Sequence, residues 1–239
     1  MPSKNAIYNL EPDNGKSPAK RKQRPAASAT SAAGNTKHLD AIEHLRKRDR
    51  TLRRIIDDIG PCRLAPQKGH FSALCEAITS QQLAVAAAAT IFRRFRDLFP
   101  RRTPTPDRLL ALDDTDLRAA GLSTQKIKYI RDLAGKFADG SVPYRRLGRM
   151  DDEQVIESLT QVKGIGVWTA HMFLIFVLNR PDIWPVDDLG IRRAVQIQYK
   201  LDDLPTADEL TTRGARWRPY RSIAAWYLWQ SLGNKPMNA

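Results

Sequence analysis

Two short groups of residues in the second half of the chain have types that could carry out chemistry together. The first is a glycine turn, Val162 to Gly166, which is followed by Trp168 and Thr169. The second is the acidic pair Asp187 and Asp188. A glycine turn that opens a helix can hold a phosphate on the free N–H groups of that helix. A carboxylate that lies close by could stabilise positive charge beside the phosphate.

The residues before the turn predict a helix that ends at Gly164, because Val155, Leu159 and Val162 have helical spacing. Gly164 and Gly166 can take positive φ angles at little cost. Neither glycine has a Cβ, so a phosphate oxygen could come close to the backbone. The alternative is a glycine that ends one helix and leads into an ordinary tight turn.

The turn and the acidic pair resemble the motifs of the helix-hairpin-helix DNA glycosylase superfamily. Specifically, they are similar to its 3-methyladenine DNA glycosylase II branch (AlkA-type), in which the turn reads Gly-Ile-Gly-x-Trp-Thr-Ala and an Asp follows a proline. Further blocks agree along the chain from Ile42 to Gly233, in the order of the family. They are Phe71 to Leu83, Gly121 to Lys126, Arg216 to Ser222, and Trp229.

The resemblance implies an all-α, two-lobed fold with the active-site cleft between the lobes. The N- and C-terminal helices would form one lobe and the middle helices the other. Apolar spacing predicts helices up to Gly60, an interrupted helical run over 71–95, and a single helix over 107–120 that ends at Gly121. Ser123 is placed to cap the next helix.

The resemblance also implies the reaction, which is hydrolysis of the N-glycosidic bond of alkylated purines such as 3-methyladenine and 7-methylguanine in duplex DNA. This step initiates base excision repair. Positive charge builds on the sugar as the base departs, and a fixed carboxylate stabilises it. By resemblance Asp188 is the catalytic residue, and Asp187 is the likelier cap of the helix that begins at Leu189. The alternative is that both residues only cap this helix.

Position 168 indicates the type of chemistry. Relatives that also cut the DNA strand have a lysine there, which forms a Schiff base with the sugar, whereas this chain has Trp168. Water should therefore be the attacking group, and no lyase activity is expected. Trp168 and Trp229 could hold a cationic base by stacking and cation–π contact. Taken singly, each is also a reasonable core residue.

A glycosylase flips its base out of the duplex, and a side chain must fill the hole that remains. Gln82, together with Leu83, aligns with the family's wedge loop, although a polar break between two helices would look the same. Gln81 is a weaker candidate for the base pocket. The turn residues expected to contact DNA are Val162, Lys163, Gly164, Ile165, Gly166 and Thr169.

Two other functions fit part of the pattern. A noncatalytic helix-hairpin-helix module could bind lesions without removing them, but the intact Asp188 and the aromatic residues disfavour it. A bifunctional glycosylase/lyase for oxidised bases is disfavoured by Trp168. The two cysteines in the chain cannot supply the four thiolates of an iron–sulfur cluster. The resemblance implies at most a monovalent cation, Na⁺ or K⁺, at the hairpin backbone, and no other cofactor.

The composition favours a polyanionic partner, because the 239 residues carry a net charge of +13 and the pI is about 10.0. Residues 1–37 contribute seven Lys or Arg and two acidic residues. Their Ser-, Ala- and Pro-rich composition predicts a disordered basic tail before a domain over 38–239, with the hairpin and catalytic segment at about 153–200. Lys20 to Arg24 could be a nuclear address or a DNA-binding arm.

The partner expected from these observations is double-stranded DNA that contains alkylated bases, bound by a monomer. The chain has no apolar run of the length that a membrane span needs. We therefore expect an intracellular protein, in the cytoplasm or nucleoid of a bacterium or in a eukaryotic nucleus.

Overall fold

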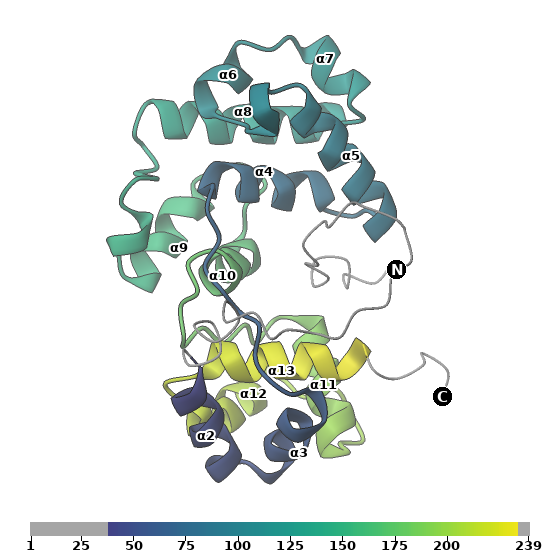
Figure 1. Cartoon of the computed structure of the whole chain (residues 1–239), viewed down its shortest axis with the longest axis vertical. Helices are drawn as coiled ribbons and strands as arrows, with labels where there is room; N and C mark the ends of the chain where they lie inside the picture. Colours follow the sequence, from purple (N-terminus) through teal and green to yellow (C-terminus); the bar gives the residue numbers. More distant parts are fainter. Residues whose placement is uncertain (1–37, 234–239) are drawn as a thin grey trace, which may run out of the picture.

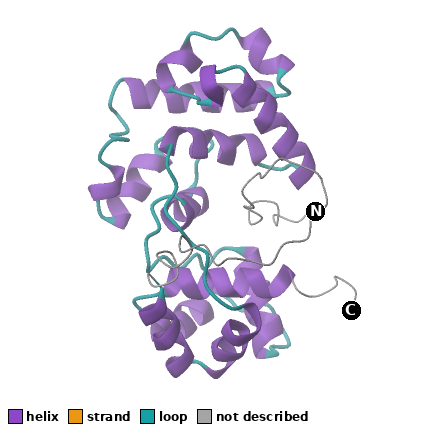
Figure 2. Cartoon of the chain, in the orientation of Figure 1, coloured by secondary structure: helices purple, strands orange, loops and turns teal. Residues whose placement is uncertain are grey.

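The computed structural model describes residues 38–233, and all regular structure in this range is helical. The helices gather into two lobes (Figures 1 and 2). The first and last helices form the lower lobe and the middle helices form the upper lobe, which confirms the expected all-α, two-lobed arrangement. The tail predicted over residues 1–37 lies outside the described residues.

The lower lobe joins the two ends of the described chain. It contains α2 (Leu39–Arg48), α3 (Arg50–Ile59), α11 (Leu189–Tyr199), α12 (Ala207–Gly214), the short helix η4 (Ala215–Trp217) and α13 (Arg221–Gly233). The buried carboxylate of Asp49 caps α3 by accepting hydrogen bonds from the backbone N–H groups of Thr51 and Leu52. It also accepts from the Tyr199 hydroxyl and the Trp217 indole, so one side chain ties the early helices to the late ones.

The upper lobe begins after a loop that crosses from α3. Its elements are α4 (His70–Ser80), α5 (Val85–Asp97), η2 (Pro100–Arg102), α6 (Pro106–Leu110), α7 (Asp114–Ala119), α8 (Thr124–Ala138), η3 (Leu147–Arg149) and α9 (Asp152–Thr160). The interruption after Ser80 and the Ser123 cap of α8 confirm the sequence predictions, because the Ser123 hydroxyl accepts from the Lys126 N–H.

The single helix expected over 107–120 is wrong, because the chain breaks between α6 and α7. Asp113 has an extended backbone and begins the second helix. The break frees carbonyl groups, and Arg131 of α8 donates to one of them, the Leu112 oxygen, at 2.7 Å. Arg131, which is distant in sequence, thus provides a donor for a carbonyl that the break leaves free. Helical spacing alone does not reveal this break.

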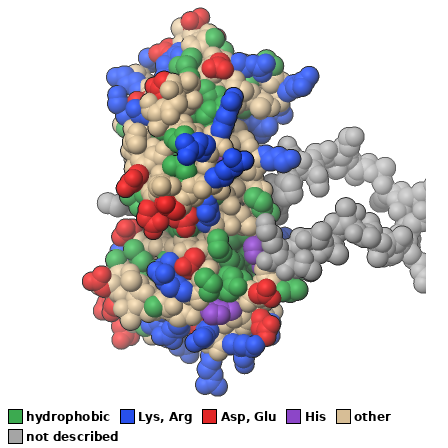
Figure 3. Space-filling view, turned by 90° about the vertical axis from the view of Figure 1, so that its left-hand side faces the viewer, with side chains coloured by type: hydrophobic (Ala, Val, Ile, Leu, Met, Phe, Trp, Pro, Cys, Tyr) green, Lys and Arg blue, Asp and Glu red, His purple; other side chains and the backbone are tan. Residues whose placement is uncertain are grey.

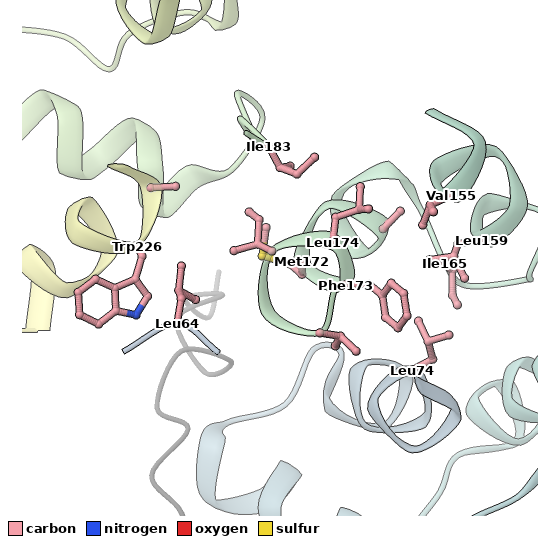
Figure 4. Packing of buried hydrophobic residues seen from close by; sticks show 14 of the residues in the cluster. Leu64, Leu74, Val155, Leu159, Ile165, Met172, Phe173, Leu174, Ile183 and Trp226 are labelled. Atoms are coloured by element: carbon pink, nitrogen blue, oxygen red, sulfur yellow. The ribbon is translucent and has the colours of Figure 1, made fainter. Parts of the chain in front are cut away.

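Helix α10 (Val167–Phe176) lies between the two lobes and is apolar on nearly all sides. Figure 4 shows Val155 and Leu159 of α9 on one side of α10, and Leu64 and Trp226 on the other. The residues of α10 from Thr169 to Ile175 are mostly buried, so neighbours on both sides hold this part of the helix. The packed body of α10 therefore supports the more exposed first turn, which carries Trp168.

The glycine turn differs in one detail from the sequence expectation. Helix α9 ends at Thr160 rather than at Gly164. Gly164 has φ of +83°, and a Cβ there would overlap the ring of Tyr129 on α8. Gly166 has φ of −100° and so does not use the positive φ that glycine permits, and a Cβ there would meet nothing within 4 Å. Of the two glycines in the turn, only Gly164 is required, because its φ is positive and a Cβ would not fit beside Tyr129.

Within the described residues, no helix combines the length and the apolar character needed to cross a membrane.

Candidate active site

The carboxylate of Asp188 is the centre of a buried cluster at the start of α11. Its Oδ1 accepts hydrogen bonds from the Ile191 backbone N–H at 2.8 Å and from Trp229 Nε1 at 2.9 Å. Its Oδ2 accepts from Trp168 Nε1 at 2.6 Å. The side chain is only 3% exposed. Three segments that are distant in sequence therefore converge on one carboxylate.

Asp188 also caps α11, since the Ile191 N–H is one of the free donors of the first turn. The expectation that Asp187 is the likelier cap is therefore wrong, and Asp187 is exposed. The extended backbone at position 188 directs that side chain back over the helix start. The capping of α11 and the acceptance of two indole N–H groups reside in the same residue.

Gly190 leaves room for this cluster. A Cβ at this position would lie 3.0 Å from Asp188 Oδ1 and 3.2 Å from Trp229 Cδ1. Both distances are shorter than ordinary van der Waals contact, so a larger residue would press the indole and the carboxylate apart.

Helix α13 is fixed where it begins, and this places Trp229. The guanidinium of Arg221 donates to both carboxylate oxygens of Asp182, at 2.8 and 2.9 Å. The next residue, Ser222, accepts a hydrogen bond from the Ile183 N–H at 2.9 Å. These contacts join α13 to the segment that leads into Asp188, so both partners of the bond between Trp229 and Asp188 are positioned together.

A cavity of about 160 Å³ lies between α4, α5 and α10, and Asp188, Trp168 and Trp229 do not line it themselves. Phe176 lines it and packs against Trp229, with ring centroids 5.5 Å apart. Thr169, which follows Trp168, lines it as well. Most of the wall is apolar, and one acidic side chain, Glu76 of α4, belongs to it. Burial raises the pKa of Glu76, and the charge of Arg96 partly offsets this.

Trp168 and Trp229, the two tryptophans assigned to the base pocket, meet at Asp188, and they contact it with their indole N–H groups. Each donates to Asp188, and Trp229 is only 4% exposed. Stacking against a base stays a prediction for both residues. The other three tryptophans, at positions 184, 217 and 226, are buried and belong to the core.

The turn residues separate into buried and exposed positions. The side chains of Val162, Ile165 and Thr169 are 1%, 4% and 6% exposed, so only their backbone atoms could reach a phosphate. The side chain of Lys163 is 73% exposed. No side chain in the described part of the structure caps α10, which leaves the N–H groups of its first turn available to a ligand.

The loop expected to act as a wedge is on the surface. Gln82 is exposed and has φ of +59°, a left-handed conformation that is uncommon for a residue other than glycine. Leu83 is half-buried. Gln81, the weaker pocket candidate, donates from Nε2 to the Gly164 carbonyl at 2.8 Å and so contacts the turn.

Several residues of the site were not identified from the sequence. Glu76 and Phe176 line the cavity, and Lys126 holds the end of α4. The small residues of α4 at 73, 77 and 80 recur on one helix face. That spacing is a signal for open space beside a helix, and it could have led to the cavity.

The residues of the turn bear on the predicted monovalent cation. The Val162 carbonyl accepts from the Ile165 N–H, and the Gly164 carbonyl accepts from Gln81. Each oxygen has a second lone pair, so the turn fits a carbonyl-bound cation, which stays a prediction. The described residues contain no group of three His, Cys, Asp or Glu side chains placed to hold a metal.

A family model and a curated protein both match most of this chain. A family model described as "HhH-GPD superfamily base excision DNA repair protein" matches residues 75–219. The curated protein "DNA-3-methyladenine glycosylase 1" of Schizosaccharomyces pombe is 37% identical over 193 residues, which is 79% of this chain and 85% of that protein.

Two solved structures are similar over most of this chain. One is the 3-methyladenine DNA glycosylase Mag1 of Schizosaccharomyces pombe in complex with abasic DNA, with a TM-score of 0.75 and 35% identity. The match covers 84% of this chain and 100% of that one. The other is a DNA-3-methyladenine glycosidase of Bacillus halodurans, with a TM-score of 0.74, 33% identity, and coverage of 81% and 89%.

Proposed function

Because the chain belongs to the HhH-GPD superfamily of base excision DNA repair proteins, we propose that it is a monofunctional glycosylase for alkylated purines in duplex DNA. The observation that carries this proposal is the Asp188 carboxylate, held by two indole N–H groups beside an apolar cavity. The proposed reaction hydrolyses the bond between base and sugar and leaves an abasic site.

The geometry suits a reaction in which positive charge develops on a sugar. Asp188 is fixed by three donors before any substrate arrives, so it need not reorganise as the charge appears. Trp168 has no amine that could form a Schiff base, which supports water as the attacking group. The structure of the Mag1 complex with abasic DNA is that of a relative bound to a product of this kind.

The surface next to Asp188 suits DNA. The first turn of α10 offers free N–H groups, and the exposed Lys163 adds a positive charge for a phosphate. Gln82 is exposed on the loop after α4, where it could enter the duplex in place of a flipped base. The cavity beside Trp229 is the proposed site for that base.

The test is single-turnover release of base from duplexes that contain 3-methyladenine, 7-methylguanine, ethenoadenine or hypoxanthine. We expect release of the two cationic methylated purines, followed by strand cleavage only when an abasic-site lyase is added. Asp188→Asn should lower release by about 10²-fold or more, as when one electrostatic stabiliser is lost. The matched control Asp187→Asn alters the exposed neighbour and should have little effect.

The alternatives predict other outcomes. A noncatalytic lesion-binding protein would retain these duplexes without releasing a base. A bifunctional enzyme would cut the strand without added lyase. Normal release by Asp188→Asn would remove Asp188 from the mechanism.

A further inference from the structure

Lys126 of α8 contacts the end of α4. Its ammonium group donates to the Thr79 carbonyl at 2.6 Å and to the Gln81 carbonyl at 2.8 Å. The last carbonyls of a helix have no partner within the helix, and a lysine is a strong donor to them. The side chain is half-buried. Lys126 therefore fixes the point at which the chain leaves α4 for the loop over residues 81–84.

The same loop is tied to the glycine turn over residues 162–166. Gln81 Nε2 donates to the Gly164 carbonyl at 2.8 Å. Helix α8 also contacts this turn, because the Tyr129 ring lies against Gly164 and the Asp132 carboxylate accepts from the Lys163 N–H at 2.9 Å. The loop, the turn and α8 therefore form a closed set of contacts.

The backbone of the loop needs such support. Gln82 has φ of +59°, and a residue other than glycine keeps this conformation only where its surroundings impose it. The carbonyl just before Gln82 is the one that Lys126 holds at 2.8 Å. Without that hydrogen bond, the chain at Gln82 could relax to an ordinary negative φ and swing its side chain away.

We propose that Lys126 is a positioning residue that holds the loop 81–84 and the glycine turn 162–166 as one unit. The Gln82 side chain, which would enter the duplex, and the turn 162–166, which would bind a phosphate of that duplex, then keep a fixed separation. The role in DNA rests on the proposed function, whereas the coupling of the two segments does not.

The coupling is tested by hydrogen–deuterium exchange of the full chain without DNA. Lys126→Met should increase exchange in both segments, and Lys126→Arg, which can still donate to two carbonyls, should restore most of the protection. The matched control is Lys128→Met. Lys128 is exposed on the same helix, and within the described residues its side chain makes no hydrogen bond or ion pair.

Gln81→Ala provides an independent variant, since it cuts the tie between loop and turn and leaves Lys126 in place. It should also increase exchange in both segments, and the double variant should show no further increase. Unchanged exchange in the turn after Lys126→Met, or an equal increase after Lys128→Met, would overturn the proposal.

The consequence for DNA is measured by excision from duplex and from single-stranded lesion substrates at saturating enzyme. Lys126→Met removes both charge-assisted hydrogen bonds and should lower duplex excision by about tenfold or more. Single-strand excision should change by less than about twofold, because only a duplex has a hole to fill. Equal losses on both substrates would contradict the positioning role.

The two proposals fail in different ways. If the wild-type protein releases no base from any duplex, the proposed function fails, and the exchange experiment still decides whether Lys126 couples the two segments.

Discussion

An asparagine at position 188 would keep one oxygen of the carboxylate and replace the other with an NH₂ group. The oxygen could still accept from Ile191 and Trp229, but the NH₂ group would face the N–H of Trp168, 2.6 Å from the atom that it replaces. Two donors would then oppose each other in a buried place, at a cost of about 1–3 kcal/mol. A loss of activity in Asp188→Asn could thus mix charge with misfit.

The double variant Asp188→Asn/Trp168→Phe separates these effects. Phenylalanine removes the opposing donor and keeps an aromatic ring, so the double variant should melt at a higher temperature than Asp188→Asn alone. Base release should stay about 10²-fold below wild type, because the negative charge is still missing. Thermal melts and single-turnover assays of the single and double variants provide the comparison. Recovery of release along with stability would mean that misfit, not charge, limits Asp188→Asn.

Gly190 gives a prediction on spacing in the same cluster. Gly190→Ala should push Trp229 and Asp188 apart by a few tenths of an ångström and lower base release by about tenfold. Gly135→Ala is the matched control, since it lies within α8 with nothing within 4 Å of the new Cβ. That variant should gain about 0.5–1 kcal/mol of stability from helix propensity and keep full activity. Full activity in both variants would show that the close approach at Gly190 is not needed.

Glu76 gives a prediction on pH. Burial raises the pKa of Glu76 above its ordinary value of 4.5, so the folded protein binds this proton more tightly than the unfolded chain. The carboxyl therefore costs no stability below pH 4.5, where it is protonated in both states, and it destabilises the fold as the pH rises through the raised pKa. Glu76→Gln should raise the melting temperature at pH 7 and have no such effect near pH 3.

The matched control for this experiment is Glu157→Gln, on the exposed face of α9. Thermal melts of both variants at pH 7 and near pH 3 test this prediction. A stabilisation by Glu76→Gln that is equal at both pH values would mean that the effect does not come from the charge.

At the scale of the element, the sequence predicted helices well where local signals end them. The Ser123 cap and the break after Ser80 both depend on neighbouring residues. The break between α6 and α7 depends on Arg131, which is distant in sequence, and so spacing indicated one helix. The choice of Asp188 over Asp187 as the cap likewise depends on backbone angles that residue types do not reveal.

The pair of Arg221 and Asp182 gives a prediction for α13. Both side chains are largely buried, at 17% and 22% exposure, and two hydrogen bonds join them. Arg221→Met should cost about 2–3 kcal/mol and lower base release, because the start of α13 and with it Trp229 would lose their fixed position. The control is Lys47→Met, whose ion pair with Glu43 is exposed to solvent, so that its loss should change stability less than the loss of the Arg221 pair.

Urea unfolding and single-turnover assays test both variants. Equal stability losses in the two variants would contradict the role assigned to the buried pair. A loss of stability in Arg221→Met with full base release would leave the pair a structural role only.

At the scale of the whole molecule, the order of the family's blocks predicted the two lobes, because it places the first and last helices together. It did not predict the cavity. That cavity arises where α4, α5 and α10 meet, and its shape depends on how far apart the helices are held. The convergence of Trp168 and Trp229 on Asp188 is of the same kind, since indole orientation is set by packing and not by spacing.

Charge is also a property of the whole molecule, and most of it can be read from the sequence. Residues 1–37 carry seven of the Lys and Arg residues and two acidic ones, a net +5 of the total +13. The remaining +8 belongs to residues 38–239. On the face drawn in Figure 3, Lys and Arg side chains are spread from the top to the bottom of the molecule, with acidic side chains among them. Attraction to DNA should therefore come from several places, including the first 37 residues.

Deleting residues 1–37 should weaken nonspecific DNA binding and flatten its dependence on salt. Each phosphate that the protein no longer neutralises reduces the steepness of log K against log salt concentration by about 0.9. Base release under single turnover at saturating enzyme should not change, since Asp188 and the tryptophans that bind it lie in the remaining chain.

A full-length variant with Gln at positions 20, 21, 22 and 24 should show part of the same flattening, because it removes charge without removing chain. An unchanged slope in both proteins would mean that these cations do not reach DNA. A loss of base release in a truncated protein that melts normally would assign the first 37 residues to the chemical step.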